Sequence, residues 1–176
     1  MARIAWTALL VVLLLGPVGS RVAAQTFQEP DAFLRETFSQ NVPEPQILNV
    51  TPAMQQDIAR ILRHSYRARQ LRYWREGGRT AWILEEIGRY RPITVGLVVS
   101  EGALDTIRVL IYRESHGWEV RHDFFTNQFK GLTLDPQNNL SGRIDGISGA
   151  TLSVNALRNL ARVALYLDRA VRASAG

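Results

Sequence analysis

The chain contains no cysteine and a single lysine, Lys130, among its 176 residues. The lack of cysteine excludes disulfide bonds, thiolate zinc sites, iron–sulfur clusters and a cysteine nucleophile. With one lysine, a P-loop lysine or a Schiff base is available only at Lys130. Positive charge therefore comes almost entirely from arginine, with 21 Lys+Arg against 16 Asp+Glu. That positive balance alone would suggest nucleic acid or an anionic membrane as a partner. The charges of the N-terminal leader, described next, must first be subtracted from it.

The first residues have the composition of an export signal. Arg3 precedes the apolar run Ile4 to Leu15, and small residues follow up to Ala24. The run is too short to span a bilayer comfortably, so we predict a secretory signal peptide over residues 1–24, with an uncleaved anchor as the alternative. The protein is then expected to be periplasmic or otherwise extracytoplasmic, which argues against nucleic acid as a partner.

Proline punctuates the segment that follows the leader. Residues 25–52 contain four prolines and few periodic apolar positions, so we predict an extended arm with at most one helical turn around Ala32–Phe38. Thr51-Pro52 is a helix start signal, and apolar residues at helical spacing predict a helix over Met54–Trp74. Residues 53–176 are expected to form the single main domain.

Beyond this helix the apolar period changes from helical to alternating. Runs rich in Val, Ile and Thr predict strands at Trp82–Ile87, Ile93–Ser100 and Leu104–Arg113, the last two forming a hairpin. We expect a short helix or turn at Phe124–Phe129 and a long amphipathic helix at Ser153–Arg172. These elements predict an α+β fold, a small antiparallel sheet with packed helices.

The last helix has two chemically different faces. Leu157, Leu160, Ala161, Ala164 and Val171 fall on one stripe, and Arg158, Arg162 and Arg169 gather on the other. The apolar stripe predicts the face that packs on the sheet.

The segment that precedes this helix, Asp145–Thr151, carries the strongest chemical signal. It joins glycines and hydroxyl side chains to a helix amino terminus, where backbone amides and the helix dipole favour an anion such as phosphate. The alternative is that Ser148, Thr151 or Ser153 simply caps the helix. A serine-hydrolase elbow fits less well, because the second glycine of that motif is missing at the required position.

The sequence Asp-Gly-Ile-Ser-Gly-Ala-Thr at 145–151 closely resembles the flavinylation motif of FMN-binding domains. Examples are the FMN-carrying subunits of the sodium-pumping NADH:quinone oxidoreductase and of the Rnf complex. Tyr112–Gly117 is similar to the Glu-Thr-Pro-Gly turn of that family, although Ser115-His116 replace Thr-Pro, and Asn127–Gly131 is similar to its Gln-Phe-x-Gly segment. The resemblance implies FMN bonded covalently through its phosphate to the hydroxyl of Thr151.

The resemblance also implies a set of cofactor-binding residues and a maturation enzyme. The expected set is Thr151, Ser148, Gly149, Ala150, Asp145, Ser153, Glu114 and Gly117. A separate FAD:protein FMN transferase, which uses FAD and a divalent metal, would attach the flavin and release AMP. Asp145 is expected to guide this transferase or to hold the turn, with a plain Asx-turn as the alternative.

The function that the resemblance implies is an exported electron-transfer flavoprotein that relays electrons between a membrane-bound redox partner and another acceptor. It would be a redox carrier rather than a turnover enzyme, with no catalytic residue and no metal site of its own. Two alternatives stay open. One is a non-redox extracytoplasmic binding module of the same fold that uses its arginine-rich faces, and the other is a small secreted reductase.

Overall fold

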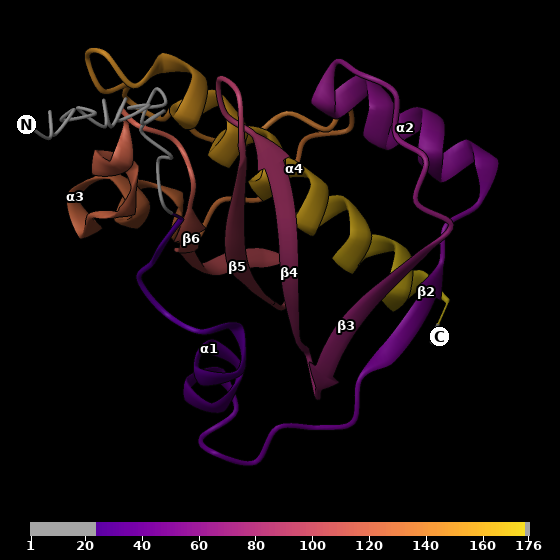
Figure 1. Ribbon diagram of the computed structural model, residues 1–176. Coiled ribbons are helices and arrows are strands. Elements are labelled where there is room, and N and C mark those ends of the chain that lie inside the picture. The colour runs from indigo at the N-terminus through magenta and orange to yellow at the C-terminus, as the bar shows by residue number, and fades with distance from the viewer. Residues whose placement is uncertain (1–23, 175–176) are drawn as a thin grey trace, which may run out of the picture.

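The computed structural model describes residues 24–174 (Figure 1). Residues 1–23 and 175–176 lie outside this range, and nearly all of the predicted leader lies there with them. Among the residues described, no helix is both long enough and apolar enough to cross a bilayer.

One antiparallel sheet of six strands organises the molecule, in the order β1-β6-β5-β4-β3-β2. The strands are β1 (Gln25–Thr26), β2 (Gln46–Asn49), β3 (Gln70–Glu76), β4 (Arg79–Ile87), β5 (Pro92–Ser100) and β6 (Ala103–Tyr112). The helices are α1 (Pro30–Thr37), α2 (Pro52–Leu62), α3 (Asp123–Thr126) and α4 (Thr151–Ala173), with 3-10 turns η1 (Trp118–Arg121) and η2 (Asn127–Phe129). The predicted α+β class is confirmed.

The three strands expected from alternation are β4, β5 and β6, and they form an antiparallel meander as predicted. The β5–β6 hairpin turns at Glu101-Gly102, both of which have positive φ (50° and 81°). Positive φ at both central residues of a hairpin turn matches the twist of the two flanking strands. Glycine adopts positive φ without strain, which explains the glycine at the second position.

Helix α4 covers one face of the sheet, where it contacts β4 and β5 (Figure 1). The predicted apolar stripe of α4 is confirmed, since all five of its residues are buried. The same core includes Trp82 of β4 and Val95, Leu97 and Val99 of β5. Burial of this stripe is the main contribution that fixes α4, because each large apolar side chain removed from water contributes about 1.5–3 kcal/mol.

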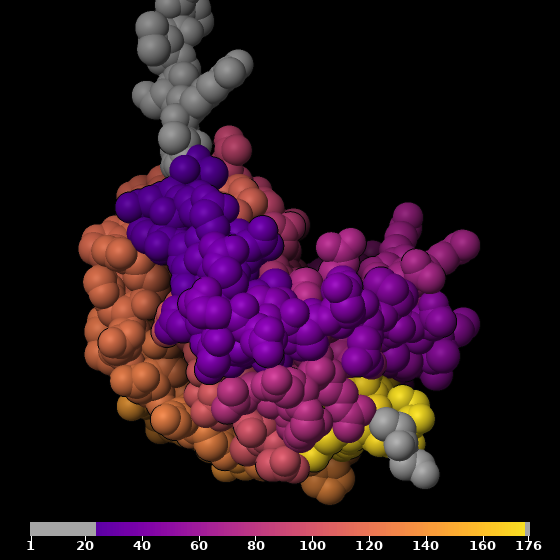
Figure 2. All heavy atoms as spheres, turned by 90° about the horizontal axis from the view of Figure 1, so that it is seen from below, coloured from indigo at the N-terminus to yellow at the C-terminus, as the bar shows by residue number. Residues whose placement is uncertain are grey.

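The other face of the sheet is covered by α1, which brings Phe33, Leu34 and Phe38 against Val98 and Leu110. Figure 2 shows the N-terminal segment lying across the molecule. The segment 25–52 is therefore more structured than predicted, with two helical turns and two short edge strands instead of an extended arm. The sheet needs this cover, because its second face is apolar as well.

The predicted helix over Met54–Trp74 was wrong in its second half. Helix α2 starts as expected, with the Thr51 hydroxyl accepting from the Met54 amide at 3.2 Å, but it ends at Leu62. Residues 70–76 form β3 instead, paired with both β2 and β4. The sheet supplies partners for the aromatic side chains of β3, and such tertiary pairing overrides a local helical pattern.

The close approach of α1 to the sheet predicts an effect at Gly96. A Cβ at this position would lie 2.7 Å from the ring of Phe33, which is buried. We expect Gly96→Ala to lower the free energy of unfolding by about 1–3 kcal/mol through overpacking, measured by urea denaturation. In a Phe33→Leu background the same change is expected to cost less, and strictly additive costs would contradict this contact.

Candidate functional site

The motif loop leads directly into the amino terminus of α4. The N-cap residue is Ala150, and no side chain in the described part of the chain caps the helix. The Ala150 amide instead donates to the Ile147 carbonyl at 3.0 Å, which closes the turn before the helix. Capping by a hydroxyl, the simpler interpretation of the motif, is therefore not what the structure contains. The first helical amides stay available to an anion.

Thr151 is the first residue of α4 and its side chain is exposed. It lies at the edge of a hollow of about 390 Å³ that is also lined by Gly149, Ala150 and Leu152. Gly149 has φ +79°, and nothing lies within 4 Å of the position that a Cβ would take there. The Thr151 hydroxyl is thus open to a bulky reactant.

Ser153 has the opposite environment. It is 4% exposed, and its hydroxyl lies 2.8 Å from that of Tyr112 on β6. The Tyr112 hydroxyl donates to the His116 carbonyl at 2.5 Å, so it accepts from Ser153. This relay joins the start of α4 to the turn after β6. The sequence did not predict this role of Tyr112, because in sequence alone an aromatic residue at the end of a strand looks like any other core residue.

Gly117 allows these two segments to meet. Its φ is +86°, and a Cβ there would lie 2.7 Å from the Ser153 hydroxyl and 3.0 Å from the Tyr112 hydroxyl. Both the backbone conformation and the lack of space require glycine. Gly117 therefore acts by close packing between the turn after β6 and the start of α4.

Glu114 stabilises the β4–β5 turn on another side of the hollow. Its carboxylate accepts hydrogen bonds from the backbone amides of Arg89, Tyr90 and Arg91 in the β4–β5 turn, at 2.5, 2.5 and 2.9 Å. Partial burial raises the pKa of Glu114, but the three amides and the Arg91 charge outweigh it, so the pKa lies below its usual value.

Asp145 lies apart from the hollow and is exposed. Its backbone amide donates to the side-chain oxygen of Gln128 at 2.7 Å, and its carboxylate lies 3.5 Å from Arg143, itself exposed. No hydrogen bond from a backbone amide to the Asp145 carboxylate occurs within residues 24–174, so the Asx-turn alternative is not realised. The Asp145 carboxylate is exposed, so another protein can reach it.

The structure thus brings together most of the predicted site residues, but not all. Five of them line the hollow, namely Thr151, Gly149, Ala150, Ser153 and Glu114. Ser148, Asp145 and Gly117 lie outside its lining. Sequence reasoning missed Arg89 and Tyr90, which line the opposite wall with the Arg89 guanidinium 4.9 Å from the ring centroid of Tyr90. Their only sequence signal was a turn before Pro92.

Trp118 is 41% exposed. It directly follows Gly117, and its ring meets that of His122 edge-on with the centroids 5.4 Å apart. The start of a 3-10 turn holds this side chain outside the core. Trp82 of β4, by contrast, is fully buried.

Residues 88–166 match the model of the FMN-binding domain family. The fold is similar to the crystal structure of Shewanella oneidensis NqrC, with a TM-score of 0.52 and 16% identity over 76% of this chain and 81% of that chain. A comparison with curated proteins found no match. The predicted resemblance to the FMN-binding domain family is confirmed over residues 88–166.

The residues around the hollow fit FMN. The helix amides and the Arg89 guanidinium suit a phosphate. Tyr90, 73% exposed, and Leu152, 47% exposed, offer flat and apolar surface beside it. FMN has an aromatic ring system joined to a phosphate by a ribityl chain, and the hollow has groups that suit the ring and the phosphate.

The hydroxyl relay predicts coupled stability effects. Tyr112→Phe and Ser153→Ala each remove one partner and leave a buried polar atom, so each is expected to cost about 1–2 kcal/mol in unfolding free energy. The double variant is expected to cost at least about 0.5 kcal/mol less than the sum, because the two share one interaction. Full additivity in denaturant melts would show that the hydroxyls act independently.

The lowered pKa of Glu114 predicts a pH dependence. Above the pKa of an unfolded glutamate, about 4.3, the charged carboxylate stabilises the fold, and this contribution is lost as the pH falls through the lower folded pKa. The stability difference between wild type and Glu114→Gln is therefore expected to be constant from about pH 7 to 5 and to shrink below about pH 4.5. Urea melts across this range measure it, and a difference that grows on acidification would reverse the sign.

Proposed function

We propose that the protein is an exported electron-transfer flavoprotein that carries FMN as a phosphoester on the Thr151 hydroxyl. The single observation that supports this most is the exposure of Thr151 at the amino end of α4, beside a hollow with partners for a phosphate and a ring. The family match supports FMN as the ligand. The leader pattern supports export.

The attachment step balances without any group from this chain other than the hydroxyl. The Thr151 oxygen attacks the FMN phosphorus of FAD, the P–O bond to the AMP moiety breaks, and AMP and one proton leave. An FAD:protein FMN transferase with a divalent metal would carry out this step. The exposed Asp145 carboxylate and the bare Gly149 surface suit its approach.

Once bound, the flavin would supply reversible electron transfer, and the protein would hold and orient it. The helix amides of α4 would stabilise the phosphodiester charge by about 0.3–1 kcal/mol. The Glu114 contacts would keep Arg89 and Tyr90 in place across the hollow. A covalent bond explains how so open a hollow would retain its cofactor, because dissociation is no longer available.

The partners in this proposal are a membrane-bound redox protein and a second acceptor. A carrier of this kind exchanges electrons through the exposed edge of its flavin, so an open hollow suits it better than an enclosed pocket. The openness at Thr151 and Leu152 is consistent with such exchange.

Coexpression with an FAD:protein FMN transferase tests the attachment. We expect wild type to show flavin fluorescence in a denaturing gel and a mass increment of one FMN. Thr151→Ala is expected to lose both, because no acceptor oxygen is left, whereas Thr151→Ser keeps an acceptor and should retain part of the signal.

Ser65→Ala is the matched control, since it removes an exposed hydroxyl that does not line the hollow and should leave the flavin in place. Fluorescent Thr151→Ala protein with the full mass increment would place the attachment elsewhere. Wild type that stays colourless and unmodified beside an active transferase would favour the non-redox binding module.

A further inference from the structure

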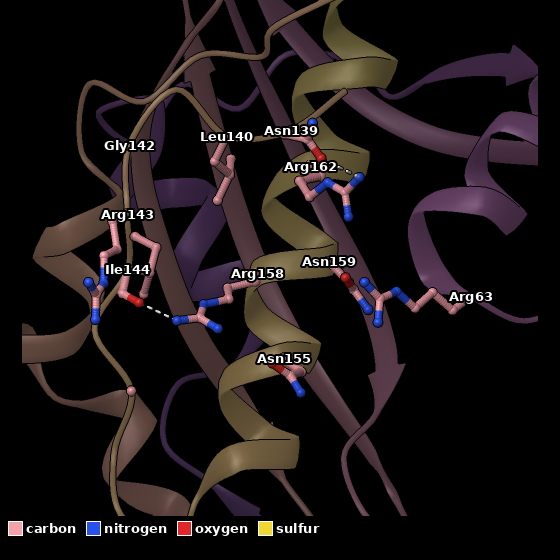
Figure 3. A pocket seen from close by; sticks show the side chains of 11 residues that line it. Arg63, Asn139, Leu140, Gly142, Arg143, Ile144, Asn155, Arg158, Asn159 and Arg162 are labelled. Atoms are coloured by element: carbon pink, nitrogen blue, oxygen red, sulfur yellow. Dashed lines mark hydrogen bonds between the residues drawn. The ribbon is translucent and has the colours of Figure 1, made fainter. Parts of the chain in front are cut away.

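A second, larger hollow of about 580 Å³ lies along the polar face of α4 (Figure 3). It is bounded by α4, by the loop over residues 139–146 and by the end of α2, which contributes Arg63. Within the described part of the chain, no residue lines both this hollow and the one at Thr151. We call it the basic hollow.

Four arginines line the basic hollow: Arg63, Arg143, Arg158 and Arg162. Asn139, Asn155 and Asn159 add amide groups, and none of the described residues that line it is a carboxylate. The planar guanidinium group of arginine can form two parallel hydrogen bonds to a phosphate or carboxylate group, and the asparagine amides add further donors. The side chains come from three separate elements, with Arg158 directed from α4 toward the loop and Arg63 directed from α2 toward α4 (Figure 3).

Two of these arginines are held in position by the loop. The Nη2 group of Arg158 donates to the Ile144 carbonyl. The Nε group of Arg162 donates to the Asn138 carbonyl at 2.6 Å. Each guanidinium has five N–H groups, so donors are left over for a ligand. Side chains that are already ordered lose less conformational entropy when they bind.

Like charges are left close together in the basic hollow. Burial lowers the pKa of Arg162, the Arg63 charge lowers it further, and Asp135 acts in the opposite direction. The carboxylate of Asp135 already accepts hydrogen bonds from loop amides, among them that of Asn139 at 2.7 Å. Arg63 itself stands at the C-cap of α2 with φ +64°, a position where glycine is usual and arginine is strained. A bound anion would relieve the repulsion between these cations.

We propose that the basic hollow binds a small anion with two or more negative charges carried on phosphate or carboxylate groups. Several guanidinium groups around one hollow favour a multiply charged ligand over a monovalent one, because each added charge finds its own partner. Binding at this site does not require flavin on Thr151, so it stands apart from the proposed function.

Isothermal titration calorimetry with pyrophosphate and with citrate tests this proposal on the exported protein, with and without flavin. We expect one anion bound per chain, with affinity that falls as the salt concentration rises. The double variant Arg63→Gln/Arg143→Gln should weaken binding about tenfold or more, the loss expected when charged hydrogen bonds are removed. These two side chains are exposed, so the fold should keep its thermal midpoint.

The matched control is Arg35→Gln/Arg67→Gln, which removes the same charge from exposed positions outside the basic hollow. It should bind pyrophosphate as wild type does. Equal weakening in both double variants, or no heat of binding at millimolar pyrophosphate, would overturn the proposal.

Vesicles distinguish the two sources of a phosphate group. Binding to phosphatidylglycerol vesicles that pyrophosphate displaces, and that Arg63→Gln/Arg143→Gln abolishes, would assign the hollow to a lipid headgroup. Binding of pyrophosphate without any vesicle binding would assign it to a free anion. Vesicle binding that both double variants lose equally would contradict a specific site.

Discussion

The contact between the turn after β6 and the first turn of α4 is the constraint on which the candidate site depends. Ser153 is tied inward to Tyr112, and Gly117 leaves the room for this contact. Successive helical residues are rotated by about 100°, so a residue two positions earlier points about 200° away. An inward Ser153 therefore directs Thr151 outward. The buried hydroxyl pair of Tyr112 and Ser153 thus determines that the Thr151 side chain faces solvent.

The far end of α4 is secured by a different kind of interaction. Asp168 is fully buried, accepts from the Thr80 hydroxyl at 2.8 Å and lies 2.9 Å from the Arg172 guanidinium. Thr80 also accepts from the indole of Trp82 at 3.0 Å. Burial raises the pKa of Asp168, while Thr80 and Arg172 oppose the rise. Together with the apolar stripe, this network fixes α4 along the sheet.

Local patterns were enough to predict the β4–β6 meander, the apolar stripe of α4 and the motif loop, because these depend on residues close in sequence. The edge strands and the end of α2 were not predictable in this way. The pairing of β3 depends on partners in β2 and β4 that no local window contains. The same holds for the site, where Thr151 was found from its motif but Tyr112 and Arg89 only from the way distant segments meet.

The hollow at Thr151 is built from three stretches of chain that lie far apart in sequence. Arg89 and Tyr90 come from the β4–β5 hairpin, Glu114 from the turn after β6, and Thr151 from the C-terminal helix. Its walls therefore exist only after the last helix has docked, which happens late for a chain made from its N-terminus. Any modification that requires the complete hollow would therefore occur only on folded molecules. Its presence would distinguish mature protein from protein that has not finished folding.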